Sequence, residues 1–146
     1  MKQVVRAAAA LLTDGQQRAL LVQQGYGQRR WGLPGSGIRA DDLPVRAVVR
    51  EVRVETALEI EVVDLIGLYH LSGNEPEGEE GLPDLLTYVF GCRVAGGEPV
   101  LNEMGRISRL GWYDLSDVPH PATTTAKAAM KDAAAGRSGV VADLSR

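Results

Sequence analysis

Residues 34 to 58 read PGSGIRADDLPVRAVVREVRVETAL and decide the fold of this chain. A glycine-rich turn leads here into a segment whose apolar residues recur at helical spacing. An α-helix advances about 100° per residue, so Glu51 and Glu55 project from the same face, one turn apart. The same spacing predicts a buried stripe of valines: Val45, Val48, Val49 and Val52. We therefore predict a helix over about residues 43 to 56 that presents two carboxylates.

Two carboxylates on one face of a helix are compatible with two roles. Mg²⁺ prefers oxygen ligands, keeps several waters and takes only one or two protein carboxylates together with substrate phosphate. Glu51 and Glu55 match that donor set. The alternative is a solvated helix face, because glutamates flanked by arginines commonly form ion pairs. The spacing alone leaves both interpretations open.

The start of this helix is irregular. Pro44 suits the first turn, where the missing N–H is not needed. Leu43 is a poor N-cap because its side chain cannot accept a hydrogen bond, so we expect Asp42 to cap the helix instead. Five valines also lower the intrinsic helix propensity of the segment.

The stretch resembles the Nudix box, whose family pattern is G-x5-E-x7-R-E-U-x-E-E-x-G-U, with U aliphatic. Five residues match at the right spacing: Arg50, Glu51, Val52, Glu55 and Leu58. Gly35 supplies the glycine that normally precedes the box, and WGLPGS at residues 31 to 36 resembles the usual lead into it. The resemblance extends over roughly residues 4 to 135.

Four box positions depart from the pattern: Ser36, Asp42, Val54 and Ala57. Val54 matters most, because the resemblance implies a metal-binding carboxylate at that position. A site limited to Glu51 and Glu55 is therefore expected to hold fewer or weaker metals. Outside the box, Arg106 stands where relatives often have a glutamate, six residues before Trp112. Glu103 is the candidate replacement, with an ordinary loop charge as the alternative.

The resemblance implies a hydrolase that depends on Mg²⁺ or Mn²⁺ and cleaves a phosphoanhydride bond. The implied substrate is a nucleoside diphosphate linked to another moiety, or a nucleoside triphosphate. The carboxylates of Glu51 and Glu55 and the carbonyl of Gly35 are the expected metal ligands. Arg50 is expected to orient a carboxylate or offset the crowded negative charge. A proton from water would pass to Glu51, Glu55 or Glu103.

A second interpretation belongs to a different class of protein. The departures from the box favour a Nudix-fold nucleotide-binding or regulatory module with little or no hydrolase activity. Arg50, Glu51 and Glu55 oppose it, because they keep the metal-binding pattern together. A helix-and-sheet domain outside the family is the third interpretation.

Other residues are candidates for contacts with the substrate. Arg29 and Arg30 carry forked guanidinium donors that match phosphate oxygens, although arginines at these positions equally suit a solvated surface. Tyr69, with Tyr26 and His70, is a candidate for lining a nucleobase or sugar pocket. The alternative for Tyr69 and His70 is the end of a half-buried strand.

The chain as a whole predicts an α+β protein with the Nudix fold, an α/β/α sandwich around a mixed central sheet. Residues 1–146 are expected to form one domain, with a loose tail at about residues 137–146. An Asp-Gly turn between two apolar runs predicts an opening hairpin. Strands are expected at about 3–13, 18–24, 60–71, 85–95 and 107–114, and a second helix at about 122–135.

Composition limits the expected partners and location. The formal net charge is −3 and the charges are mixed, so no basic stripe predicts a nucleic-acid polymer as partner, whereas a small nucleotide or nucleotide-linked molecule fits. The lone Cys92 excludes an internal disulfide, is expected to be a buried structural thiol and is consistent with the cytoplasm. No apolar run approaches the length that spans a membrane. A homodimer is left open, because many relatives dimerise.

Overall fold

The computed structural model describes residues 3–73, 83–101 and 106–145. The elements, in chain order, are β1 (Val4–Thr13), β2 (Arg18–Gln24), β3 (Trp31–Gly32), β4 (Gly35–Gly37), α1 (Pro44–Thr56), β5 (Glu59–Leu71), β6 (Asp84–Gly96), β7 (Ile107–Asp114), α2 (Thr124–Ala134) and β8 (Val140–Asp143). The predicted order of helices and strands is confirmed. The structure adds two short strands in the glycine-rich loop and a last strand near the C-terminus.

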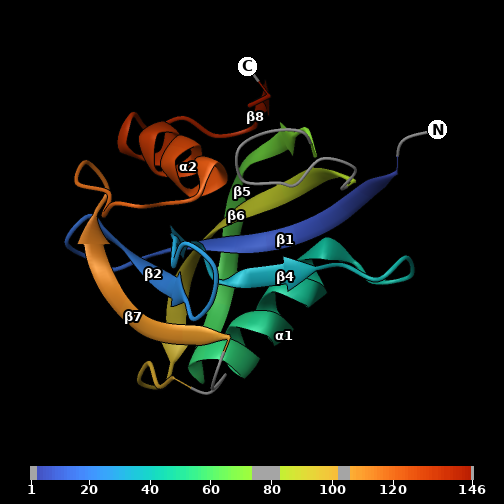
Figure 1. Cartoon of the computed structure of the whole chain (residues 1–146). Helices are drawn as coiled ribbons and strands as arrows, with labels where there is room; N and C mark the ends of the chain where they lie inside the picture. The colour runs from blue at the N-terminus through green and yellow to red at the C-terminus, as the bar shows by residue number, and fades with distance from the viewer. Residues whose placement is uncertain (1–2, 74–82, 102–105, 146) are drawn as a thin grey trace.

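The described strands form one mixed sheet between the two helices. The strand order is β3-β2-β1-β6-β5-β8, with β4 also paired to β1 and β7 paired to β2. β1 runs parallel to β6 over its whole length, whereas β5 is antiparallel to β6. Figure 1 shows α1 and α2 on opposite sides of this sheet. The α/β/α sandwich is therefore confirmed.

Strand β1 contributes to a hydrophobic core on each side of the sheet, because successive side chains of a strand point to opposite faces. Ala9 and Leu11 pack on the α2 side, in a core that includes Met130 of α2. Leu12 packs on the α1 side, in a core that includes Val48 of α1. Both helices are thereby anchored to the same strand. Neither described helix has the length and apolar character that a membrane crossing requires.

Helix α1 begins without a side-chain cap. The N-cap residue is Leu43, and no side chain accepts a hydrogen bond from the first turn. The expectation that Asp42 caps the helix is wrong, because its carboxylate instead accepts a hydrogen bond from Arg50 Nη2 at 2.9 Å. The valine stripe is also narrower than predicted, since Val45 is 46% exposed while Val48 is fully buried.

The expected loose tail at residues 137–146 contains an edge strand, so that prediction is wrong for β8. β8 pairs in parallel with β5, from Gly67 opposite Val140 to His70 opposite Asp143. The N–H of Leu144 continues the pairing by donating to the His70 carbonyl at 2.8 Å. Cys92 is 3% exposed, which confirms a buried thiol. One domain over residues 1–146 stays a prediction.

The glycine-rich loop passes close under β1 at Gly35. Gly35 has φ +150°, a conformation that residues with a side chain rarely adopt. A Cβ atom at this position would overlap the carbonyl oxygen of Ala8 and the Cα of Ala9. Only glycine therefore allows β4 to pair with β1 at this distance.

We predict that Gly35→Ala lowers the free energy of unfolding by about 1–3 kcal/mol or more, because it adds backbone strain and a steric overlap. Urea unfolding measures the change. Gly15→Ala is the matched control, since nothing lies within 4 Å of a Cβ at that turn position. An unfolding midpoint of Gly35→Ala equal to that of the control would contradict the close approach.

Candidate active site

A cavity of about 560 Å³ opens along β1 and β4. Its wall also takes residues from α1, β6, α2 and the segments that precede β3 and β7. The polar groups on this wall include Arg30, Gly35, Glu55, Asp84, Arg106 and Thr123. The volume falls within the range of small-molecule sites, about 300–1,000 Å³.

Glu55 brings a buried carboxylate to the wall of this cavity. The residue is 7% exposed, near the C-terminal end of α1. Its Oε1 accepts a hydrogen bond from the N–H of Gly35 at 2.8 Å. Burying a carboxylate is costly unless hydrogen bonds or a cation compensate for the lost water. Gly35 and Glu55, both predicted as metal ligands, thus lie together on the cavity wall.

Glu51 lies one turn before Glu55 on α1, next to Arg50. The Glu51 side chain is 21% exposed, and the structure does not place it on the cavity wall. Arg50 Nε lies 3.5 Å from Glu51 Oε1, and Arg50 Nη2 lies 2.9 Å from Asp42 Oδ2. The hydrogen bond from Arg50 lowers the pKa of Asp42. Arg50 therefore lies between two carboxylates and offsets their charge.

The donor set fits one hydrated Mg²⁺ or Mn²⁺ ion. Residues one turn apart on a helix have Cβ atoms about 5–6 Å apart, so Glu51 and Glu55 are near enough to share an ion's hydration shell. In the part of the chain that the structure describes, no three His, Cys, Asp or Glu side chains form a metal-binding group. Val54 is 43% exposed and supplies no oxygen ligand. Glu103 lies outside the described residues.

The two predicted phosphate-binding arginines differ in position. Arg30 lines the cavity, and Arg29 is absent from the described cavity wall. Arg29 occupies a tight turn with φ +52°, where its N–H donates to the Tyr26 carbonyl at 3.1 Å. The prediction for Arg29 therefore lacks structural support. Arg106, which the sequence marked only as a departure from the family pattern, lines the cavity with Arg30.

Asp84 and Thr123 also line the cavity, and neither belongs to the family pattern. Asp84 begins β6 after a glycine- and proline-containing acidic stretch, a composition typical of a solvated loop. Thr123 caps α2, since its hydroxyl oxygen accepts the N–H of Ala126 at 3.2 Å. Asp84 and Thr123 are far apart in the sequence, and the tertiary fold brings them to one cavity.

The structure does not support the predicted substrate contact of Tyr69, because Tyr69 is buried and is absent from the described cavity wall. Its side chain is 1% exposed and belongs to the core on the α2 side of the sheet. The Tyr69 hydroxyl donates to Asp132 Oδ2 on α2 at 2.6 Å. Burial, and next this hydrogen bond, raise the pKa of Tyr69. Tyr69 thus joins β5 to α2 inside the protein.

His70 links β8 to the rim of the cavity. Its Nε2 lies 2.8 Å from Asp84 Oδ2, and its Nδ1 lies 3.1 Å from Asp143 Oδ1. The hydrogen bonds to Asp84 and then Asp143 raise the pKa of His70. The backbone N–H of Ser145, followed by His70, lowers the pKa of Asp143 to about 2. Carboxylates at both ring nitrogens favour the protonated form of His70, in which both nitrogens carry a hydrogen to donate.

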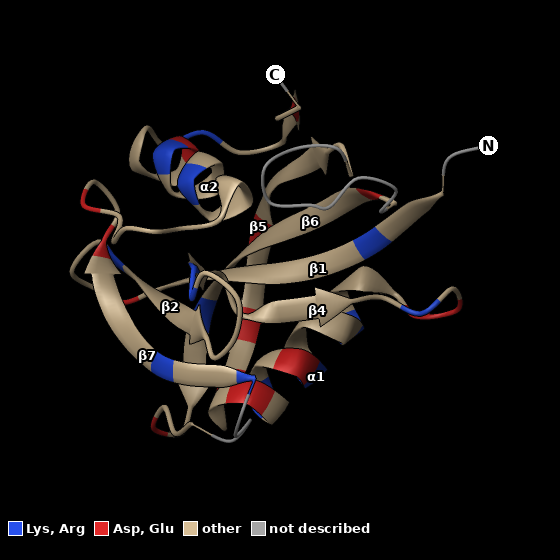
Figure 2. Cartoon of the chain, in the orientation of Figure 1, with Lys and Arg blue, Asp and Glu red and all other residues tan. Residues whose placement is uncertain are grey.

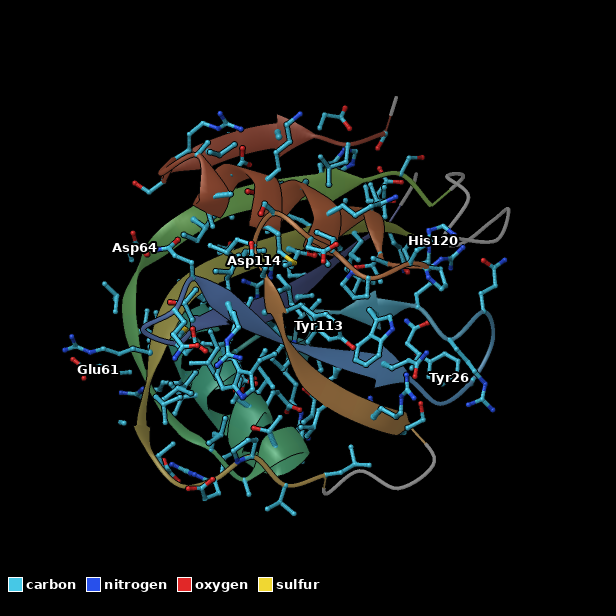
Figure 3. The ribbon with its side chains drawn as sticks, turned by 90° about the vertical axis from the view of Figure 1, so that its left-hand side faces the viewer. Tyr26, Glu61, Asp64, Tyr113, Asp114 and His120 are labelled. Carbon is cyan, nitrogen blue, oxygen red and sulfur yellow. The ribbon has the colours of Figure 1, made fainter. Side chains whose placement is uncertain are left out.

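We predict that Tyr69→Phe lowers the free energy of unfolding by about 1 kcal/mol, because Asp132 loses a hydrogen-bond donor in a partly buried position. Chemical denaturation measures the loss. Tyr26→Phe is the matched control, since Tyr26 is 60% exposed and Figure 3 shows it at the surface. Equal stability of the two variants would contradict the Tyr69–Asp132 bond.

The His70 bridge predicts a defined pH dependence of stability. The folded pKa of His70 lies above its ordinary value of 6.5, so its contribution is complete below that pH and is lost as pH rises through the folded pKa. The Asp143 contribution is present above 3.8 and is lost as pH falls toward about 2. His70→Gln is expected to flatten the loss of stability as the pH rises above about 6.5.

Thermal unfolding across this pH range provides the measurement. His120→Gln is the matched control, because the chain has two histidines and His120 is exposed (Figure 3). His120→Gln should keep the wild-type pH profile. If the thermal stability of His70→Gln changed with pH as that of the wild type does, the bridge would make no contribution to stability that depends on protonation of His70.

Comparison with known proteins identifies the family. Residues 3–133 match the model of the NUDIX domain. A MutT-like protein of Streptomyces ambofaciens is 36% identical over 88 residues, which cover 60% of this chain and 51% of that protein. An ADP-ribose pyrophosphatase of Methanocaldococcus jannaschii is 29% identical over 89 residues, which cover 61% of this chain and 48% of that protein. The chain thus spans about half the length of these relatives.

Solved structures agree with the family match. The MutT NUDIX hydrolase of Burkholderia pseudomallei superimposes with a TM-score of 0.79 at 26% identity, covering 90% of this chain and 98% of that one. An ADP-ribose pyrophosphatase of Streptococcus suis shares the fold, with a TM-score of 0.69 at 23% identity and coverage of 95% and 98%. The mixed sheet, its two flanking helices and the family match over most of the sequence together show that this chain belongs to the Nudix hydrolase family.

Proposed function

We propose that this chain hydrolyses a phosphoanhydride bond with the help of Mg²⁺ or Mn²⁺. The substrate is a nucleoside diphosphate linked to another moiety, or a nucleoside triphosphate. The observation that carries the proposal is the buried carboxylate of Glu55, which the Gly35 amide holds on the wall of a cavity of about 560 Å³. Two similar proteins bear the names ADP-ribose pyrophosphatase and RNA pyrophosphohydrolase, which agree with this reaction class.

The proposed roles follow from the positions of the side chains. Glu51, Glu55 and the Gly35 carbonyl would hold the divalent ion. When bound, the ion supplies charge neutralisation of the phosphates and acidifies a coordinated water. Arg50 keeps Glu51 oriented and lessens the repulsion between neighbouring carboxylates, since it bonds Asp42 on its other side. Of the candidate bases Glu51, Glu55 and Glu103, the position of Glu55 on the wall favours it as proton acceptor.

The cavity and the charge of the chain support a small nucleotide-linked substrate. A cavity of about 560 Å³ is the size of a small-molecule site rather than a groove for a polymer. The net charge of −3 agrees, because nucleic-acid polymers are bound mainly by basic surfaces. A cytoplasmic location and a homodimer stay predictions.

A nucleotide-binding module with little or no hydrolysis is the second candidate. It is favoured by the exposed Val54, which places no carboxylate beside Glu51 and Glu55. Across residues 3–73, 83–101 and 106–145, the structure also contains no group of three potential metal-binding side chains. A weak metal site would bind a nucleotide without activating water efficiently.

We predict that Glu55→Gln and Glu51→Gln each lower kcat by about 10²-fold or more, because each removes a charged oxygen needed to hold the ion or accept a proton. Hydrolysis of nucleoside triphosphates, nucleotide sugars and dinucleoside polyphosphates with Mg²⁺ or Mn²⁺ measures this. Glu59→Gln is the matched control, since that exposed carboxylate at the start of β5 pairs with Arg53.

The outcomes separate the two candidates. Turnover by the wild type and by Glu59→Gln, with loss in both site variants, supports the hydrolase. Wild-type protein that binds nucleotides in the presence of Mn²⁺ but hydrolyses none of the panel supports the binding module. Unchanged turnover in Glu55→Gln would overturn the site assignment for either function.

A further inference from the structure

The cavity combines an acidic region with a basic one. Its wall includes the carboxylate of Glu55 and, from other segments, the guanidinium groups of Arg30 and Arg106. Figure 2 shows where acidic and basic residues lie in the fold. The proposed function uses the acidic region for the divalent ion and leaves the two arginines without a role.

The backbone brings both arginines to the end of β2. The N–H of Gln24 donates to the carbonyl of Arg30 at 3.0 Å, and the next N–H, from Gly25, donates to the carbonyl of Arg106 at 2.9 Å. Arg30 immediately precedes β3 and Arg106 immediately precedes β7, and both of these strands pair with β2. Two adjacent amides therefore fix two arginine residues beside one strand end, and both residues line the same cavity.

The charge of Arg30 is suited to an anionic ligand. Its Nη2 donates to the side-chain oxygen of Gln28 at 2.7 Å, which is a neutral partner. Within the part of the chain that the structure describes, Arg30 forms no ion pair with a carboxylate. A guanidinium group offers parallel N–H donors that match the oxygens of a phosphate.

An aromatic residue lines the same cavity as the two arginines. Tyr26 lines the cavity, is 60% exposed and follows directly after Gly25. Its ring offers an apolar surface to a sugar or base next to the phosphate-binding groups. Figure 3 shows Tyr26 on the side of the molecule opposite Glu61 and Asp64. The combination favours a phosphate carried on a nucleoside over a free inorganic anion.

We propose that Arg30 and Arg106 bind a phosphate monoester that the substrate carries in addition to the anhydride that is cleaved. The preferred substrates are then nucleoside diphosphate derivatives with a further phosphate on the ribose. This inference rests on the proposed function, because Glu55 and Gly35 are assigned there to the anhydride. It narrows the substrate class through two residues that the family pattern does not use.

Matched substrate pairs test the inference. NADPH and NADH differ by one ribose phosphate, as do coenzyme A and its dephospho form. The wild type is expected to favour the phosphorylated member of at least one pair by about tenfold or more in kcat/KM, mainly through a lower KM. Arg30→Ala and Arg106→Ala should each reduce that preference, and the double variant should abolish it.

Two further variants separate charge from geometry. Arg30→Lys keeps the positive charge but loses the forked donors, so it should retain only part of the preference. Arg46→Ala is the control, because Arg46 is exposed on α1 and lies outside the described wall of the cavity. A loss of preference in Arg46→Ala equal to that in Arg30→Ala would assign the effect to net charge and overturn the inference.

Binding without turnover distinguishes this inference from the proposed function. Calorimetry with adenosine 2′,5′-bisphosphate, adenosine 3′,5′-bisphosphate and AMP gives affinities that need no hydrolysis. Tighter binding of one bisphosphate than of AMP, lost in the double arginine variant, supports the inference even if every substrate in the hydrolysis panel is left intact. Equal affinities for all three ligands in the wild type would overturn it, whether or not the protein is a hydrolase.

Discussion

The close approach of Gly35 to β1 is the constraint on which the rest of the site depends. Because Gly35 has no side chain, β4 can pair with β1 at Ala8 and Ala9. Its N–H then meets the carboxylate of Glu55 at 2.8 Å. This hydrogen bond connects the glycine-rich loop to α1. The packing of Val48 and Val52 holds α1 against the sheet. The position of the acidic group in the cavity follows from both.

The two hydrophobic cores lie on the two faces of the sheet, which lets the cavity carry polar groups. Burial of apolar side chains on both sides of β1 supplies the main stabilisation, and each helix covers one of the two cores. The wall of the cavity combines core residues such as Ala8 and Ala9 with polar residues that belong to neither core. Arg30, Asp84 and Arg106 lie at or just before the starts of strands, and none of them belongs to either core.

Local patterns predicted most elements of the fold, whereas positions set by distant contacts were missed. The apolar spacing around Val48 and Val52 sufficed for α1, and the Asp-Gly turn sufficed for the first hairpin. β8 was missed because its partner is β5, about 70 residues earlier in the chain, and no local pattern encodes that pairing.

The site was predicted in part for the same reason. Glu55 and Gly35 follow from the helical spacing and the family pattern, and the structure brings them together. Alternation along β5 implies that Tyr69 and His70 face opposite sides, but only the packing of α2 shows that Tyr69 is the buried one. Arg29 and Arg30 are neighbours of the same type. The positive φ of Arg29 separates their positions, and that turn conformation is not visible in the residue types.

The parallel pairing of β1 with β6 has a consequence for the order of folding during synthesis. Val4 pairs with Asp84 and Thr13 pairs with Arg93, so no part of β1 can gain its parallel neighbour until β6 has left the ribosome. Because a chain is synthesised from its N-terminus, the apolar strand β1 stays without its parallel partner while the intervening elements are made. Pairings this distant in sequence also slow folding. The apolar strand β1 therefore lacks its parallel partner for as long as the chain up to the end of β6 is being made.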